Sequence, residues 1–200
     1  ENVGVGLSSL FSNTTGGGNT AVGRSALQNN TTASNNTAIG HDALIVNTTG
    51  TQNDAVGAYA LGANTTGANN VAMGNGALGA NTTASNNTAV GNAALTANTT
   101  GTAHAAFGAN ALQSNTDGNG NTALGNLALT ANTTADGNTA VGAFSMENNT
   151  TGQLSVALGR YALRANTTGG SNVAVGNDAL GGNTTGGYNI AIGRVALAAN

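Results

Sequence analysis

The sequence repeats itself every 17 residues without an insertion or a deletion. Glycine recurs at this spacing twelve times, from Gly6 to Gly193, and asparagine does the same from Asn13 to Asn200. The consensus is x-N-[TV]-A-V-G-x-x-A-L-x-A-N-T-T-G-x, numbered here 1 to 17 so that the fixed glycine is position 6. A fixed period indicates a repeat architecture in which each unit packs only on its neighbours. We therefore expect residues 1–200 to form a single repeat array, with eleven full repeats and a partial one, taken from a longer fibre protein.

The composition excludes several classes of function. Arginine and lysine number four against seven acidic residues, and there is no lysine and no cysteine. So few positive charges give no basis for binding nucleic acid. No apolar run approaches the roughly 20 residues of a membrane span, so we expect no membrane insertion. The strict spacing of large apolar residues also argues against a disordered, low-complexity chain.

Four positions of the repeat accept only a narrow set of small or apolar residues, which is typical of a core. Position 4 is alanine in every repeat but the first, and position 9 is alanine or serine. Position 10 is leucine in all repeats except one, and position 5 is always a large apolar residue. We expect them to form straight internal stacks along the array. The stacks include Leu27, Leu44 and Leu61 at position 10, and Val22, Ile39 and Val56 at position 5.

The Asn-Thr-Ala-Val segment that precedes each glycine predicts a short β-strand. Its alanine and valine point to opposite faces of a strand, yet both positions are restricted. Both faces are therefore expected to be covered, one by the interior of the coil and the other by a second copy of the chain. We predict an all-β parallel β-solenoid, or β-roll, with one 17-residue coil per layer and a homotrimeric assembly. At about 4.8 Å per layer the rod would be roughly 55–60 Å long.

The second half of each repeat admits two interpretations. The restricted positions 6, 9, 10 and 13 match the spacing of a helical turn. Stacked strands lie about 4.8 Å apart, however, whereas packed helices need roughly 8 Å between their axes. We prefer a second strand or an irregular extended segment, with a short helical turn as the alternative.

The fixed polar positions predict structural ladders at the corners of the coils. Stacked asparagine side chains can hydrogen-bond to the coils above and below and satisfy the backbone of a turn. The Asn-Thr-Thr triplets also match a glycosylation acceptor, but an asparagine held in a ladder has no free amide for a sugar. The ladder residues include Gly6, Gly23, Gly40 and Gly57 at position 6, and Asn13, Asn30, Asn47 and Asn64 at position 13.

No constellation of residues predicts catalysis, and we expect no enzyme, no cofactor and no metal site. His41 and His104 occupy different positions of the repeat, and the aspartates form no calcium-binding pattern. Gly74–Gly79 matches G-x-G-x-x-G, but no βαβ unit or acidic partner accompanies it. Positions 7, 8 and 11 vary freely and are expected on the surface. Aromatic and arginine side chains are favoured at interfaces, so contacts with a receptor or glycan are expected at Tyr59, Phe144, Tyr161 and Arg160.

Two segments carry a resemblance to a known family: Asn36-Thr37-Ala38-Ile39-Gly40-His41-Asp42-Ala43 and Asn172-Val173-Ala174-Val175-Gly176-Asn177-Asp178-Ala179. Both resemble the N-S-V-A-I-G-x-x-A head repeats of trimeric autotransporter adhesins, and the A-L-x-x-N-T-T-G part is similar to repeats of phage tail fibres. In the adhesins the repeat is about three residues shorter. The resemblance implies a β-roll, three associated chains and no catalytic residues.

Two functions follow as expectations. The first is the shaft or head of an extracellular fibre, on a cell surface or a virion, that acts as a stiff spacer and adhesive surface. The alternative is an ice-binding or self-assembling filament protein that uses regular threonine columns, such as Thr14, Thr31, Thr48, Thr65, Thr82 and Thr99.

Overall fold

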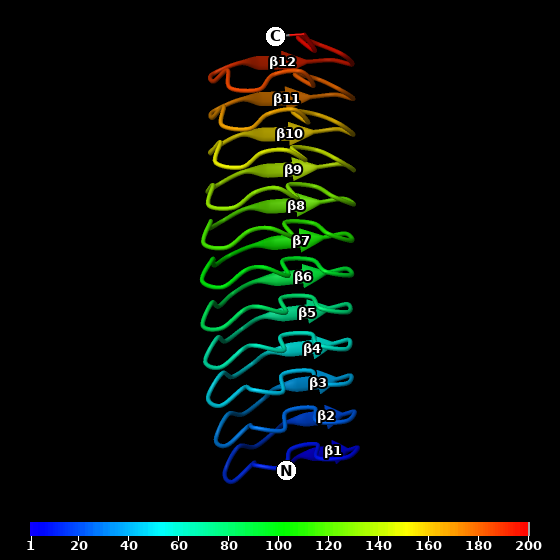
Figure 1. Cartoon of the computed structure of the whole chain (residues 1–200), viewed down its shortest axis with the longest axis vertical. Coiled ribbons are helices and arrows are strands. Elements are labelled where there is room, and N and C mark those ends of the chain that lie inside the picture. The colour runs from blue at the N-terminus through cyan, green and yellow to red at the C-terminus, as the bar shows by residue number, and fades with distance from the viewer. Residues whose placement is uncertain (200) are drawn as a thin grey trace.

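The computed structural model describes residues 1–199 as a rod of stacked coils, each contributing one short strand to a single parallel sheet (Figure 1). Each strand pairs with the equivalent residues of the next coil, so that residue i lies beside residue i+17 throughout. The chain is therefore a parallel β-solenoid with a 17-residue coil. The strands are β1 (Val3–Val5), β2 (Thr20–Val22), β3 (Thr37–Ile39), β4 (Asp54–Val56), β5 (Val71–Met73), β6 (Thr88–Val90), β7 (Ala105–Phe107), β8 (Thr122–Leu124), β9 (Thr139–Val141), β10 (Val156–Leu158), β11 (Val173–Val175) and β12 (Ile190–Ile192).

The glycine at position 6 ends each strand because no other residue fits there. Its φ lies between 126° and 145° in every coil, a region that side chains rarely adopt. A Cβ atom on Gly40 would also lie 2.5 Å from the carbonyl oxygen of Gly57 in the next coil. The stacking of coils at this corner therefore requires glycine for two reasons: its backbone angle, and the lack of a side chain that would collide with the next coil.

The segment after the glycine is neither a second strand nor a helical turn. In the coil of β2 it is a run of overlapping turns, closed by bonds from Ala26 N to Gly23 O (3.4 Å), Gln28 N to Ser25 O (3.2 Å) and Asn30 N to Leu27 O (3.2 Å). Positions 8 and 10 adopt left-handed backbone angles, with φ of 56° at Ser25 and 50° at Leu27. Of the expected forms, a second strand and a helical turn are absent from residues 1–199, and the segment is irregular but folded into turns rather than extended.

The turns satisfy the stacking constraint that a helix would violate. Leu27 N donates to Ala43 O of the next coil at 3.0 Å, and Asn29 N donates to Ile45 O at 3.0 Å. Alternate residues of the segment are thereby bonded between coils, as in a sheet. In a helical turn these backbone N–H groups would bond to carbonyl groups of the same coil. Stacked helical turns would also need a wider spacing between coils than the strands allow.

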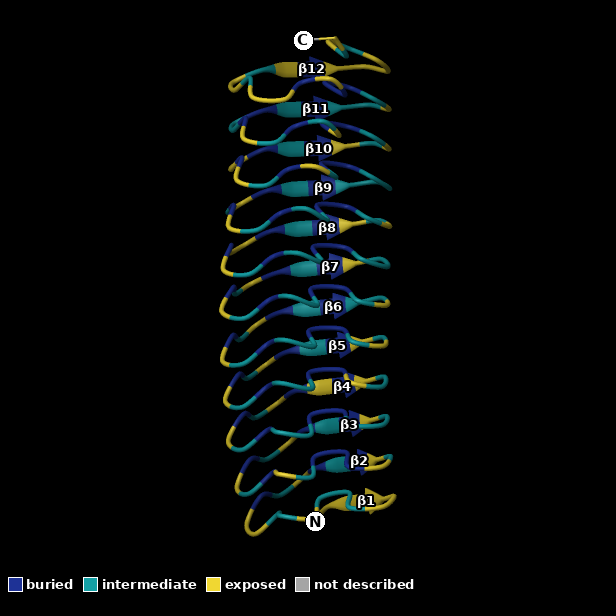
Figure 2. Cartoon of the chain, viewed as in Figure 1, coloured by how far each residue is buried: buried dark blue, intermediate teal, exposed yellow. Residues whose placement is uncertain are grey.

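The core is narrow and consists almost entirely of alanine and leucine. Alanine at positions 4 and 9 and leucine at position 10 are fully buried along most of the rod, and Met146 replaces leucine once. The expected internal stacks are thus present for alanine and leucine, including Leu27, Leu44 and Leu61. Figure 2 shows this buried layer running through the coils from β2 to β11.

The expectation that position 5 is internal was wrong. Val22, Ile39 and Val56 stack along the rod, but on the outer face of the sheet, and Val22 is 36% exposed and Ile39 40% exposed. The reason is the alternation of side chains along a strand: alanine at position 4 faces inward, so its neighbour at position 5 must face outward. A leucine from position 10 fills the interior instead.

Candidate interaction surfaces

The asparagines at position 13 form a buried ladder along the rod. From Asn30 to Asn183, each side-chain amide donates to the Oδ1 atom of the asparagine one coil earlier, at 2.8–3.2 Å. Each amide also donates to the carbonyl three residues ahead, as from Asn64 to Gly67 at 3.0 Å. The asparagines of the Asn-Thr-Thr triplets are therefore engaged on both sides in structural bonds.

A second ladder runs along position 2. Here the side-chain oxygen of one asparagine accepts from the backbone N–H of the next, as from Asn36 N to Asn19 Oδ1 at 3.0 Å. The ladder stays unbroken where the residue changes: Asn172 N donates to Ser155 Oγ at 3.1 Å, and Asn121 N donates to His104 Nδ1 at 3.2 Å. Among residues 1–199, no buried side-chain nitrogen or oxygen lacks a partner.

His104 takes over both roles of the asparagine that it replaces. Its Nδ1 atom is the acceptor, its Nε2 atom lies 3.1 Å from Nδ2 of Asn115, and the ring also interacts with the carbonyl of Gly118, as an asparagine amide does in other coils. Burial lowers the pKa of His104 from its usual 6.5. A proton on Nδ1 would also face the N–H of Asn121. This position is thus built for a neutral imidazole.

The outer face of the sheet carries a continuous apolar column, called here the outer stripe. Along one side of it lie the residues of position 3, mostly threonine and valine, and Asp54 is the only charged residue at positions 3 and 5. Most members of the outer stripe are exposed by a third or more, for example Phe107 at 43%. A single chain leaves this apolar face in contact with water. The outer stripe consists of Val5, Val22, Ile39, Val56, Met73, Val90, Phe107, Leu124, Val141, Leu158, Val175 and Ile192.

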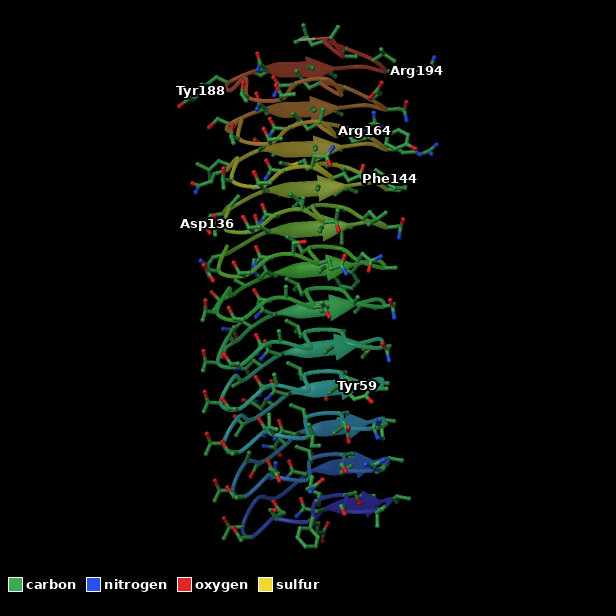
Figure 3. All side chains as sticks on the ribbon, in the orientation of Figure 1. Tyr59, Asp136, Phe144, Arg164, Tyr188 and Arg194 are labelled. Atoms are coloured by element: carbon green, nitrogen blue, oxygen red, sulfur yellow. The ribbon has the colours of Figure 1, made fainter. Side chains whose placement is uncertain are left out.

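Aromatic and arginine side chains gather at the turn that follows β9 and β10 (Figure 3). The rings of Phe144 and Tyr161 lie 5.3 Å apart at an angle of 31°. The guanidinium carbon atoms of Arg160 and Arg164 lie 4.3 Å and 5.0 Å from the centroid of the Tyr161 ring. These four residues are called the aromatic–arginine cluster. Three of them are among the contacts expected from the sequence.

Tyr59 and Arg164 differ from the expectation in opposite ways. Tyr59 lies apart from the cluster, with its ring 5.2 Å from that of His41 in an edge-on arrangement. Arg164 was not expected in a contact, and it joins the cluster because a turn connects Arg164 N to Tyr161 O at 3.2 Å. That turn brings position 11 back towards position 8. The sequence gives no signal for it beyond the variability of both positions.

The threonine columns differ from each other in exposure. At position 14 the hydroxyl donates to the carbonyl of the next threonine in the column, as from Thr65 Oγ1 to Thr82 O at 3.0 Å. The threonines at position 15 are exposed instead, and Asp117 interrupts their column once. The threonines first expected to form a flat rank, such as Thr14 and Thr31, thus direct their hydroxyls along the rod.

Over residues 1–199 the structure has no pocket and no group of three metal-binding side chains. The same residues include no helix long and apolar enough to cross a membrane. Comparison with protein families, curated proteins and solved structures gave no match to this chain. The candidate interaction surfaces of the described residues are the outer stripe, the aromatic–arginine cluster and the exposed threonines.

Proposed function

We propose that this chain is the structural and adhesive repeat region of an extracellular fibre, either a surface adhesin or a viral tail fibre. The observation that supports this most is the unbroken register of the coils, in which every strand pairs with residues 17 positions away. Such a stack specifies length and stiffness, and its reach increases with every added coil. The variable positions are left for contact with other molecules.

We further propose that the fibre is a homotrimer whose chains meet through their outer stripes. Each coil presents one large apolar side chain at the same place, so a parallel neighbour would bury a stripe along the whole rod. Each Å² of apolar surface removed from water contributes about 25 cal/mol, and small contacts therefore add up over many coils. The number three rests on the resemblance to autotransporter heads, and closed rings are the usual form of such homo-oligomers.

Sedimentation of the whole chain tests this assembly. A trimer has three times the 19.1 kDa mass of one chain. Replacing Phe107 by glutamate at the centre of the outer stripe should yield a folded monomer, because association would bury an unpaired charge. The control is Thr100→Glu at position 15, where Asp117 already occupies the equivalent place. A wild-type chain that sediments as a folded monomer at all concentrations would refute the assembly.

The extracellular location is part of the same proposal, as is a receptor or glycan as the partner. An antibody against this region that labels intact cells or virions would support it, and labelling only after lysis would count against it.

One observation favours the alternative of ice binding. Threonine is exposed at position 15 in ten coils, which gives a regularly spaced row of methyl and hydroxyl groups. Thermal hysteresis of the purified chain, and its loss on replacing Thr66 and Thr83 by lysine, would establish this function. A freezing point equal to the melting point would exclude it.

A further inference from the structure

The aromatic–arginine cluster is the point at which the chain departs most from its own repeat. Position 8 carries Leu127, Phe144 and Tyr161 in three consecutive coils, whereas most other coils have a small or polar residue there. These side chains are only half-buried, and Arg160 and Arg164 are exposed. The repeat itself does not require such residues, because Gly76 and Ala93 occupy the same position with similar backbone angles.

The two guanidinium groups are held in place without a carboxylate partner. Arg164 lies one coil above Glu147 at the same position of the repeat, yet its guanidinium lies by the ring of Tyr161 instead. Arg160 donates to the hydroxyl oxygen of Tyr161 at 2.5 Å. Within residues 1–199 no arginine pairs with a carboxylate, and the sole contact of a basic nitrogen with a carboxylate oxygen is that of His41 with Asp42 at 3.5 Å. Most of the five N–H donors of each guanidinium are therefore directed to solvent.

On the side towards β11 the cluster is bordered by Asp178, whose backbone N–H donates to Arg160 O at 3.0 Å. The next coil has glycine at positions 11 and 12, Gly181 and Gly182, so no side chain of these positions overhangs Arg164. Asp178 is the nearest acidic residue of that coil, and its carboxylate lies beside Gly181 and makes no ion pair with either arginine. The result is a shallow platform with two rings and two cations, bordered on the side towards β11 by the carboxylate of Asp178.

We propose that this platform binds an acidic saccharide, with a carboxylate or sulfate group at the arginines and a sugar ring on Tyr161 and Phe144. Guanidinium groups pair with such anions through two parallel hydrogen bonds. A flat platform without a pocket cannot enclose the apolar side chains of a peptide, but it can contact the flat face of a sugar ring. Two arginines are too few to follow the many phosphates of a nucleic acid, but they suffice for one acidic sugar residue. This inference rests on the proposed adhesive fibre and names its ligand class.

The test is titration of the whole chain with defined probes, followed by ligand-detected NMR. The probes are tetragalacturonate for carboxylates, a heparin-derived tetrasaccharide for sulfates, neutral maltotetraose, and tetraglutamate as an acidic peptide. At least one acidic saccharide should bind, and maltotetraose and tetraglutamate should bind roughly tenfold more weakly or not at all. The two acidic probes show which anion is preferred.

The variants locate the site. Tyr161→Ala and the pair Arg160→Gln with Arg164→Gln should each weaken binding by roughly tenfold. Arg24→Gln removes an arginine at position 7 of another coil and should leave binding unchanged. Alanine is compatible with the fold at position 8, since Ala93 has a φ of 54° there. Circular dichroism then confirms that each variant is folded.

Three results would overturn the inference: no binding of either acidic saccharide, equal binding by all variants, or binding of tetraglutamate as tight as that of the saccharides. None of these three results bears on the fibre proposal, because that proposal is tested separately by sedimentation of the trimer. A monomeric chain that still binds an acidic saccharide at Tyr161 would, conversely, refute the fibre and retain the site.

Discussion

Removing one asparagine from the position-13 ladder should destabilise the rod far more than removing an exposed one. Asn64 donates to Asn47 Oδ1 at 2.9 Å and to Gly67 O at 3.0 Å, and it accepts from Asn81 at 2.8 Å. Asn64→Ala deletes these three bonds and leaves the buried Asn47 Oδ1 without this donor. At about 1 kcal/mol for each bond and a further 1–3 kcal/mol for an unsatisfied buried group, the loss is roughly 4–6 kcal/mol.

Asn64→Asp sharpens this prediction because it keeps the shape and removes the donor. The new carboxylate oxygen would face Asn47 Oδ1 and Gly67 O, and no cation lies in the ladder to offset its charge. We expect a larger loss than with alanine at pH 7. Burial should raise the pKa of the new carboxyl, so that lowering the pH through that pKa restores part of the stability, since a protonated carboxyl regains one donor.

Hydrogen exchange is the appropriate assay, because coils of a repeat protein can open separately. The free energy of opening should fall most for amides of the coils around Asn64. The matched control is Asn92→Ala, an exposed asparagine at position 7, where alanine occurs naturally at Ala58 and Ala109. If Asn64→Ala lies within about 1 kcal/mol of that control, the ladder does not stabilise the rod as argued.

Three further changes test other parts of the structure. Burial lowers the pKa of His104 below its usual 6.5, so the contribution of His104 to stability is full above pH 6.5 and decreases as the pH falls towards the folded pKa. Thermal melts between pH 8 and 5 should show this loss of stability. The His104→Asn variant should not show it. Gly91→Ala should lower the free energy of unfolding by about 3 kcal/mol or more, because the new Cβ would lie 2.4 Å from Gly108 O. At Gly76 a Cβ would have no atom closer than 3.5 Å, so Gly76→Ala should cost less than half as much. Denaturant unfolding measures both. Leu95→Ala should destabilise the core by about 2–5 kcal/mol, whereas Leu124→Ala on the outer stripe should weaken association in sedimentation without a comparable loss in the monomer.

Much of this fold could be predicted from the sequence because the repeat averages out local ambiguity. A restricted residue such as Leu27 recurs in nearly every coil, which shows that it faces the same environment each time. The coil length, the strand before each glycine and the alanine–leucine core follow from this. The side of the sheet on which position 5 lies does not, because an apolar residue fits equally well inside a coil or against a partner.

The turn after the glycine could not be predicted because its backbone is set by neighbours. Residues as different as Ser25, Tyr59 and Leu127 share left-handed angles at position 8, which none of them prefers alone. Bonds between the coils impose that conformation on whatever residue is present. At position 1, by contrast, Gly18 and Asn35 mark the left-handed angle, because both residue types tolerate it.

The aromatic–arginine cluster was predictable only in part. Phe144, Tyr161 and Arg160 stand out because they differ from the other coils at surface positions. Arg164 lies close to Tyr161 through the turn between them, and therefore depends on the same backbone that the sequence did not reveal.

The identical length of the coils determines how the rod would respond to pulling on its two ends. Bonds between coils would break one coil at a time, starting at an end, because each coil is held only by its neighbours. Each released coil would add 17 residues of extended chain, about 58 Å, in place of about 5 Å of rod. A fibre anchored at one end and attached at the other would therefore lengthen under load in equal steps of roughly 50 Å, and dissipate the load at each step before its attachment is broken.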